Sequence, residues 1–391
     1  MDTTYIFLQQ YWWFLVSLLG ALLVFLMFVQ GGQTLIYTLG KTEDEKTLII
    51  NCLGHKWEFT FTTLVTFGGA FFASFPLFYS TSFGGAYWVW MAILLFFVIQ
   101  AVSYEFRSKA NNLLGKKTYE WFLILNGLFG TVLVGTAVGT FFTGSMFSID
   151  QSKIANVGGN MAISQWDGPA YGLEAVLNPL NVVLGLAVFF LARILGALYI
   201  MNCIDNEKIL ERAKKQVLYN AVPFLVFFLS FVACILLKDG FGFAIEDVGN
   251  NKAFIRSDLP YKYLNNFIQM PVVGVVFLLG VIGVLWGIIS TVFSATIYTK
   301  GIWFAGVGTV LTELALLLNV GWNGTAYYPS TSDLQSSLTI YNSSSSKFTL
   351  TAMSIVSLFI PFVLAYIVYM WRLINKKKLV LNDIQTESHI Y

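Results

Sequence analysis

The sequence of 391 residues has few charged side chains for its length. Asp, Glu, Lys and Arg make up 11% of the chain, while hydrophobic residues make up 57%. Ordinary soluble domains carry roughly 25% charged residues, so a soluble fold of this composition would lack the charge needed to cover its exterior. The composition excludes an intrinsically disordered chain, a disulfide-stapled secreted domain and a nucleic-acid-binding protein.

Residues that bind metals are also scarce. The three cysteines, Cys52, Cys203 and Cys234, lie far apart in the sequence, so they predict neither a disulfide framework nor a thiolate metal site. The two histidines, His55 and His389, both lie outside the middle of an apolar run. We therefore expect no metal site and no haem held by this chain alone. No phosphate loop, zinc-protease motif or Ser-His-Asp arrangement is recognisable, so we expect no catalytic residue in the chain by itself.

Long apolar segments are abundant. Nine of them are about long enough to cross a hydrocarbon layer of ~30 Å as helices. They predict an all-α polytopic membrane protein in which residues 1–391 form a single membrane domain. The expected spans are 11–36, 59–80, 86–104, 119–142, 173–200, 218–237, 270–293, 300–320 and 349–371.

The distribution of basic residues predicts how these spans are oriented. If the N-terminus lies outside, most of the loop Lys and Arg residues fall inside, in segments such as 107–117, 208–215 and 372–378. This asymmetry is the positive-inside pattern, and nine spans then place the C-terminus inside (N-out/C-in). Because the first ten residues contain no basic residue, we expect the span 11–36 to stay as an anchor rather than to be a cleaved signal peptide.

Ionisable residues at the ends of spans are candidates for function, because charge is costly in a bilayer. Glu58, at the start of the second span, has two interpretations. It is either a helix N-terminal acid that faces the head groups or a proton acceptor at the inner mouth of a path. Glu105, at the end of the third span, is expected to form an interfacial ion pair with Arg107 or Lys109.

Three further polar residues fall inside spans. Arg193 lies near the inner end of the fifth span, where its side chain can extend to the interface. Glu313 lies near the middle of the eighth span, where it is protonated, paired across helices or in contact with water. Gln100 is a neutral polar residue in the third span. A coupled Arg193–Glu313 pair would be typical of a secondary transporter or ion channel, which is the alternative function.

Several segments, taken in order, resemble subunit II of the cytochrome bd-type quinol oxidases. The similar segments are the aromatic run 11–15, Ile49-Ile50-Asn51, Trp57-Glu58, the stretch 68–79, the segment 105–109, Asn178-Pro179, and the segments 330–332, 337–342 and 347–350 before the last span. The resemblance implies two four-helix bundles and one further, peripheral helix. In this chain the bundles would comprise approximately residues 1–142 and 173–320, and the peripheral helix residues 349–371.

The resemblance also implies a function in the bacterial plasma membrane. Such a complex oxidises a membrane quinol at the outer face and reduces O₂ to water. Haems b and d and the quinol site would belong to the partner, subunit I, while this chain would contact lipids and would hold a quinone between its helices. A small accessory subunit is a further expected partner. The family's proton path from the cytoplasm is matched by Glu58, with Glu105 and Arg107 near the inner mouth.

The chain departs from the family pattern at three places. Near the end of the first span an acidic motif of the family is replaced by Gln30-Gly31-Gly32-Gln33. The Asn and Trp that usually follow the acid of the second span are replaced by the segment 59–63, and an Arg common in the third span is replaced by Gln100. These changes indicate a divergent branch that lacks the groups on which a family proton route or quinone pocket at these places would rely.

Overall fold

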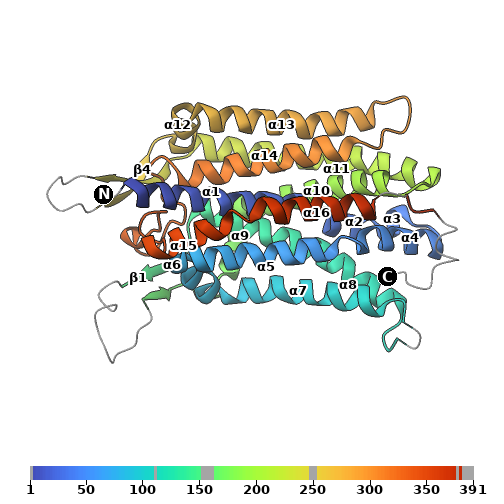
Figure 1. Cartoon of the computed structure of the whole chain (residues 1–391), viewed down its shortest axis with the longest axis horizontal. Helices are drawn as coiled ribbons and strands as arrows, with labels where there is room; N and C mark the ends of the chain where they lie inside the picture. The colour runs from blue at the N-terminus through green and yellow to red at the C-terminus, as the bar shows by residue number, and fades with distance from the viewer. Residues whose placement is uncertain (1–2, 110–111, 151–162, 246–252, 376–377, 381–391) are drawn as a thin grey trace.

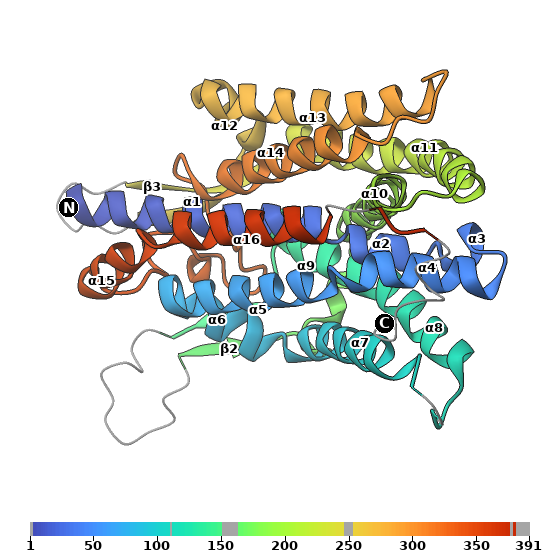
Figure 2. The same ribbon diagram turned by 45° about the vertical axis from the view of Figure 1, so that its right-hand side comes forward.

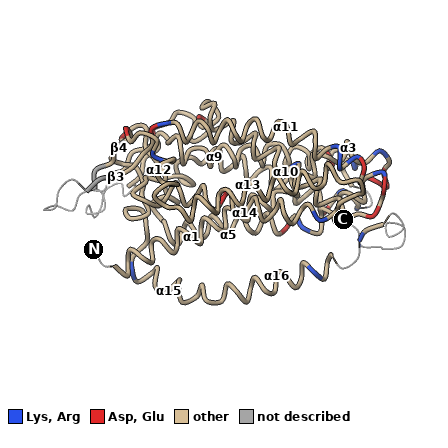
Figure 3. The backbone as a smooth tube through the Cα atoms, turned by 90° about the horizontal axis from the view of Figure 1, so that it is seen from above, with Lys and Arg blue, Asp and Glu red and all other residues tan. Residues whose placement is uncertain are grey.

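The computed structural model describes residues 3–109, 112–150, 163–245, 253–375 and 378–380. Within these ranges long helices lie side by side along a common direction (Figure 1). Helix α1 (Thr3–Leu26) begins at one end of the bundle, where two small hairpins lie, and α16 (Ile360–Ile374) ends toward the opposite end. Lys, Arg, Asp and Glu gather mainly at the two ends, and the middle carries few of them (Figure 3).

Seven helical segments of the described chain are long and apolar enough to cross a membrane, and an eighth is formed if a bent pair counts as one. The pair is α15 (Lys347–Ser357) with α16, bent by 40°. The seven are α1 with α2 (Phe28–Gln33), α7 (Tyr87–Phe106), α8 (Lys116–Leu125) through η2 (Asn126–Gly130) to α9 (Thr131–Thr143), α10 (Pro179–Cys203), α11 (Glu207–Leu237), α13 (Pro271–Val292) and α14 (Gly301–Gly321). The prediction of an all-α membrane protein is confirmed.

The expected span 59–80 takes a different form. It divides into α5 (Trp57–Ser74), α6 (Pro76–Tyr79) and a π-helical turn, η1 (Ser80–Gly85). Helix α5 packs against α1 and α15 (Figure 2). It is not among the helices apolar enough to be a candidate span, because its sequence carries Glu58 and four threonines. The helix breaks at Phe75 because a residue before proline disfavours the helical conformation.

The starts of three other spans differ from those expected. The first span begins at Thr3 rather than at residue 11. Residues Leu173–Leu177 form a 3₁₀ helix, η4, and α10 begins only at Pro179. Asn178 caps α10 through an oxygen that accepts a hydrogen bond from the amide of Leu180, and proline is well suited to the first helical position. Helix α11 begins before the expected residue 218, because Asn206 caps a polar first segment that precedes the apolar one.

The remaining short elements cover the two ends of the bundle. At the end where α1 begins, β1 (Phe147–Ile149) pairs with β2 (Ser164–Trp166) and β3 (Gly240–Ile245) pairs with β4 (Ala253–Leu259), both antiparallel. Helix α12 (Lys262–Gln269) and the 3₁₀ helix η5 (Leu334–Ser336) lie at this end too. At the opposite end, α3 (Ile36–Leu39) and α4 (Glu43–Gly54) connect α2 to α5.

Helix α10 holds the bundle together, because it packs against α2, α9, α11 and α14. Its contact with α2 depends on glycine. A Cβ built on Gly31 would lie 1.9 Å from the carbonyl oxygen of Ala192, and one built on Gly196 would lie 2.3 Å from the amide nitrogen of Gly32. Both neighbours are backbone atoms, which cannot move without separating the helices. Small residues of this kind allow helices to approach closely in membranes.

We expect Gly31→Ala to destabilise the protein, because the added methyl group would force α2 away from α10. Overpacking of this kind costs about 1–3 kcal/mol. The matched control is Gly69→Ala in α5, where an added Cβ meets nothing within 4 Å. The apparent melting temperature of the purified protein should fall for Gly31→Ala and stay level or rise for Gly69→Ala. Equal melting temperatures for the two variants would contradict the close crossing of α2 and α10.

Candidate functional site

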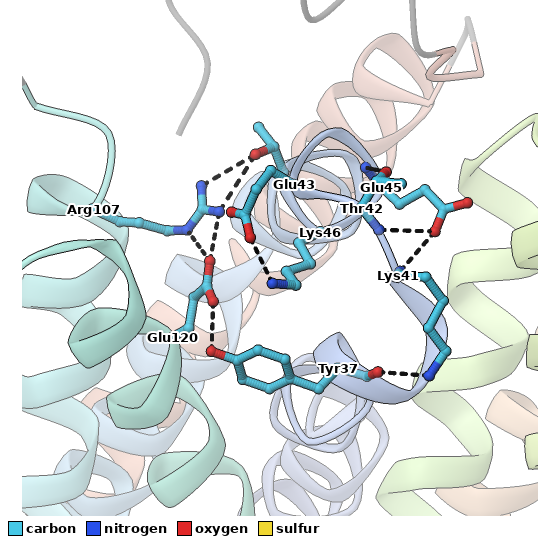
Figure 4. A network of polar contacts seen from close by, with 9 residues as sticks. Tyr37, Lys41, Thr42, Glu43, Glu45, Lys46, Arg107 and Glu120 are labelled. Carbon is cyan, nitrogen blue, oxygen red and sulfur yellow. Dashed lines mark hydrogen bonds and ion pairs between the residues drawn. The ribbon is translucent and has the colours of Figure 1, made fainter.

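A buried ion pair lies at the α3–α4 end of the bundle (Figure 4). The guanidinium of Arg107 donates to Oε1 of Glu120 from Nε at 3.1 Å and from Nη2 at 2.7 Å. Both side chains are 1% exposed. The other carboxylate oxygen of Glu120 accepts a hydrogen bond of 2.7 Å from the hydroxyl of Tyr37. Both carboxylate oxygens are thus bonded, which is what a buried charge requires.

The chain brings these residues together through a tight connection between α7 and α8. Arg107 directly follows the last residue of α7, and its carbonyl oxygen accepts a hydrogen bond from Nδ2 of Asn112. Oδ1 of Asn112 accepts in turn from the amide of Gly115, which has a φ of +79° and immediately precedes α8. Glycine suits this conformation because it lacks a Cβ. The turn thereby sets Glu120, on α8, opposite Arg107.

The ion pair also connects to the α3–α4 segment. Both terminal nitrogens of Arg107 lie 3.4 Å from the hydroxyl of Thr47 on α4. Burial and the neighbouring Glu120 carboxylate raise the pKa of Tyr37 to about 12, so Tyr37 stays a hydrogen-bond donor at neutral pH. Nearby, Nζ of Lys46 lies 2.7 Å from Glu43. Charged groups of three segments therefore form one network at this end (Figure 4).

A second carboxylate joins the α3–α4 segment to α11. Glu45 completes a capping box with Thr42 at the start of α4. Its Oε2 also accepts from the amide of Lys41 at 2.7 Å and from Arg212 at 2.8 Å. Burial acts to raise the pKa of Glu45, but the amide of Lys41 and the guanidinium of Arg212 outweigh it and hold the pKa below its usual value. Arg212 also donates to the carbonyl oxygen of Leu39.

Buried amides continue from the ion pair toward the interior. Nε2 of Gln33 donates to the hydroxyl of Tyr104 at 3.0 Å, and Nε2 of Gln30 donates to Oε1 of Gln100 at 3.2 Å. Asn126, in the π-helical turn η2, is buried as well. We call Gln30, Gln33, Gln100, Tyr104 and Asn126 the polar track. The element η2 contacts both α2 and α7, and the two hydrogen bonds join α2 to α7.

Several polar atoms of this track have no partner within the described chain. They are Oε1 of Gln30, Oε1 of Gln33, Nε2 of Gln100 and both side-chain polar atoms of Asn126. Leaving a buried donor or acceptor unpaired costs about 1–3 kcal/mol. Such groups are ordinarily satisfied by buried water, so the track has the chemical character of a hydrated path.

The proton-path residues expected from the sequence lie in different surroundings. Glu58 is exposed on the first turn of α5, and its neighbour Trp57 stacks on Tyr104 with ring centroids 5.8 Å apart. Glu105 pairs with Lys109 at 3.0 Å, and both side chains are more than half exposed. The prediction that Glu105 pairs with Arg107 or Lys109 is therefore confirmed for Lys109, while Arg107 is committed to Glu120.

The two ionisable residues within spans are not an ion pair. Arg193 donates from Nε to Oδ1 of Asn220 at 2.7 Å and from Nη1 to the hydroxyl of Thr34 at 3.0 Å. Glu313 lines two apolar cavities, one of about 120 Å³ walled by α1, α10, α11, α13 and α14, and a smaller one on its other side. The coupled Arg193–Glu313 pair that a transporter would use is absent among the ion pairs of the described residues.

Glu120 and Tyr37 were not predicted from the sequence. Glu120 follows Lys116 and Lys117 and stands in the first residues of an expected span, where an acid ordinarily faces the head groups. One feature of the sequence does point to Glu120. It is an acid near the start of a span, and only a short loop separates that span from the basic residue Arg107. Burial of the pair arises from the fold of that loop, which no local pattern encodes.

Histidines and clusters of metal-binding side chains are scarce in the described chain. Of the two histidines, His55 is exposed at the end of α4, and His389 lies outside the described residues. No group of three or more His, Cys, Asp or Glu residues in the described ranges could hold a metal ion. A haem needs an axial ligand in an enclosed pocket, and an exposed imidazole does not offer one.

Comparison with known proteins gives one consistent family. The sequence profile described as cytochrome bd terminal oxidase subunit II matches residues 8–374. The chain is 25% identical over 393 residues to the cytochrome bd-I ubiquinol oxidase subunit 2 of Escherichia coli K12, covering 97% of each chain. It is 25% identical over 377 residues to a probable cytochrome oxidase subunit 2 of Haemophilus influenzae, covering 93% of each.

A partial match and a solved structure agree with these. The cytochrome bd ubiquinol oxidase subunit 2 of Bacillus subtilis is 31% identical over 151 residues, which cover 38% of this chain and 45% of that relative. A chain of the bd oxidase structure from Geobacillus thermodenitrificans superposes with a TM-score of 0.59 at 15% sequence identity. The match covers 96% of this chain and 100% of that chain, so the two share a fold.

We expect Glu120→Gln to destabilise the protein strongly, because it leaves the buried Arg107 guanidinium without its counter-charge. Breaking a buried pair from one side costs about 3–5 kcal/mol. The control is Glu105→Gln, which removes the same charge from an exposed pair on the adjacent helix and should cost less than about 1 kcal/mol. Thermal unfolding of the purified protein compares the two. A melting temperature for Glu120→Gln no lower than that for Glu105→Gln would contradict the buried pair.

Proposed function

The chain belongs to the cytochrome bd terminal oxidase subunit II family, and from this premise we propose that it carries protons from the cytoplasm toward the oxygen-reducing centre of the complex. As subunit II of a bacterial respiratory quinol oxidase, it is a multi-pass membrane protein and works with subunit I.

In the proposed division of labour, subunit I holds haems b and d and oxidises the quinol at the outer face. The scarcity of haem ligands in the described part of this chain supports that assignment. Oxygen reduction to water consumes protons, which must reach a buried site. If they come from the cytoplasm while quinol protons leave outside, the reaction separates charge across the membrane without a pump.

The observation that supports proton uptake by this chain is the polar track. Its amides and the Tyr104 hydroxyl are buried, yet five of its side-chain polar atoms have no partner within the described chain. Water molecules bonded to these atoms would form a chain through which protons pass between neighbouring oxygens. Amides are neutral, so they can hold such water without the cost of burying charged side chains.

We assign the entrance of the path to Glu58. It is exposed at the start of α5, and Trp57, next to it in sequence, stacks on Tyr104 of the track. A carboxylate at this position can collect a proton from water and pass it on. Glu105, paired with Lys109, lies near the same end, and Arg107 with Glu120 fixes the end of α7, which carries Tyr104 and Gln100.

We expect Glu58→Gln to slow turnover, because the amide cannot accept a proton from the cytoplasm. Losing a group that transfers a proton in the chemical step costs ~100-fold or more. Water can partly bypass an entrance residue, so the expected loss in oxygen consumption is about tenfold. Voltage generation in proteoliposomes should fall in parallel. The control is Glu211→Gln, an exposed acid on α11. Unchanged oxygen consumption and voltage in Glu58→Gln would overturn the role of Glu58.

We also propose nine membrane spans, with the N-terminus outside and the C-terminus inside. Helices α5 and α6 would form one span, the second in chain order, and would raise the number from eight to nine. Helix α5 lies alongside α1 and continues in the same direction through α6 (Figure 1). The first bundle would comprise residues 1–142, the second 173–320, and α15 with α16 the peripheral helix.

This topology predicts which introduced cysteines react with a membrane-impermeant maleimide applied to intact cells. Ser332→Cys, exposed beside the hairpins, should be labelled, and Glu211→Cys, exposed near the start of α11, should be labelled only after the cells are opened. The unmodified chain gives the background of its own thiols. The reverse pattern would place the N-terminus inside.

Three further parts of the proposal concern ligands and partners. A quinone between the helices would find apolar walls in the cavity of about 120 Å³ beside Glu313. Lipids would cover the exposed apolar side chains of α13 and α16, such as Val272 and Phe362. A small accessory subunit would pack on the same kind of lipid-facing surface.

A further inference from the structure

A cavity of about 530 Å³ opens between α16 and the rest of the bundle, at the end opposite the hairpins. Figure 3 shows α15 and α16 at the edge of the bundle. The apolar side of the cavity includes Phe25, Ile367 and Val368, and its polar side includes Trp371, Arg372 and Asn375. The cavity therefore has an apolar surface along α16 and a polar surface at the last turn of that helix.

A buried cation stands behind the polar surface. Lys56 is 0% exposed, and its Nζ lies 4.5 Å from the ring centroid of Trp371. Nζ of Lys56 and Nε1 of Trp371 both lack a hydrogen-bond partner among the described residues. Burial lowers the pKa of Lys56 to about 8, and the nearby thiols of Cys203 and Cys52 act in the opposite direction. The ammonium is attracted by the ring face, but no counter-charge accompanies it.

The polar side of the cavity carries net positive charge, and Nδ2 of Asn375 has no hydrogen-bond partner among the described residues. Arg372 contributes a guanidinium, and Asn375 contributes an amide beside the hydroxyl of Tyr199. No Asp or Glu lines the cavity, and neither Arg372 nor Lys56 belongs to an ion pair of the described chain. A buried cation without a partner is costly, so this arrangement is suited to an anion that is supplied from outside the chain.

We propose that the cavity binds an anionic phospholipid, with the head-group phosphate held by Arg372 and Trp371 and neutralising Lys56 behind the ring. An acyl chain would lie along Phe25, Ile367 and Val368, between α1 and α16. The same phosphate chemistry could be offered by free phosphate, but the apolar half of the cavity matches a molecule that has a hydrocarbon part. The lipid would fill the space between α16 and the bundle and fasten that helix.

The test is native mass spectrometry of the purified oxidase complex, which counts the lipids retained. Delipidated complex is titrated with phosphatidylglycerol and, separately, with phosphatidylcholine of the same chains. We expect the tightest phosphatidylglycerol molecule to be lost from Lys56→Met/Arg372→Gln, with an affinity about fivefold lower for each cation removed. Lys208→Met, which removes an exposed lysine from α11 at the same end, should bind like the unmodified complex.

Two arms separate the alternatives. Lys56→Arg/Arg372→Lys keeps both charges and should retain the lipid, and Arg372→Gln alone changes an exposed residue, so it tests the site even if the buried substitution prevents assembly. Displacement of the lipid by excess inorganic phosphate would assign the site to a free anion and overturn the lipid proposal. Equal phosphatidylglycerol affinity in Arg372→Gln and the unmodified complex would also overturn it. Both readouts are independent of oxygen consumption and proton uptake.

Discussion

The buried ion pair between Arg107 and Glu120 is the interaction on which one end of this bundle depends. It joins the end of α7 to α8, and through Tyr37 and Thr47 it reaches α3 and α4. Two charges taken out of water stabilise a structure only when their remaining hydrogen-bonding positions are satisfied. Here both carboxylate oxygens are bonded, so the pair positions the helices that carry the polar track.

The polar track differs from the ion pair in how its polar atoms are bonded. Around Arg107 the charged groups are paired within the chain, which gives a fixed arrangement. Along Gln30, Gln33, Gln100 and Asn126 several polar atoms are left without protein partners. We propose that these buried amides hold water in the interior, because a bilayer protein seldom buries polar groups without a role for them. In the proposed function this water would carry protons toward the centre that reduces oxygen.

Much of the fold could be predicted from the sequence, because a bilayer demands long apolar helices. Seven or eight of the expected spans correspond to such helices of the described chain. The exceptions have local physical causes. Pro76 interrupts the second expected span, and the bend between α15 and α16 occurs where Pro361 enters the helix. The residues around both prolines are still apolar, so the pattern of apolar runs does not reveal either break.

The functional residues were less predictable, because their roles depend on tertiary neighbours. Glu58 and Glu105 are prominent in sequence, yet both side chains are exposed in the folded chain. Glu120 lies close to two lysines in sequence, but the turn between α7 and α8 places it opposite Arg107, with which it pairs. In the sequence Lys56 has the pattern of an ordinary interfacial lysine. Its burial depends on Trp371 of α16, which is distant in sequence and lies against it in the fold.

The most direct test of the central claim is a high-resolution cryo-electron microscopy map of the assembled oxidase. The account predicts ordered water density bonded to Gln30, Gln33, Gln100 and Asn126, continuous toward Trp57 and Glu58. A dry track, in which these amides bond only to one another or to the backbone, would contradict it.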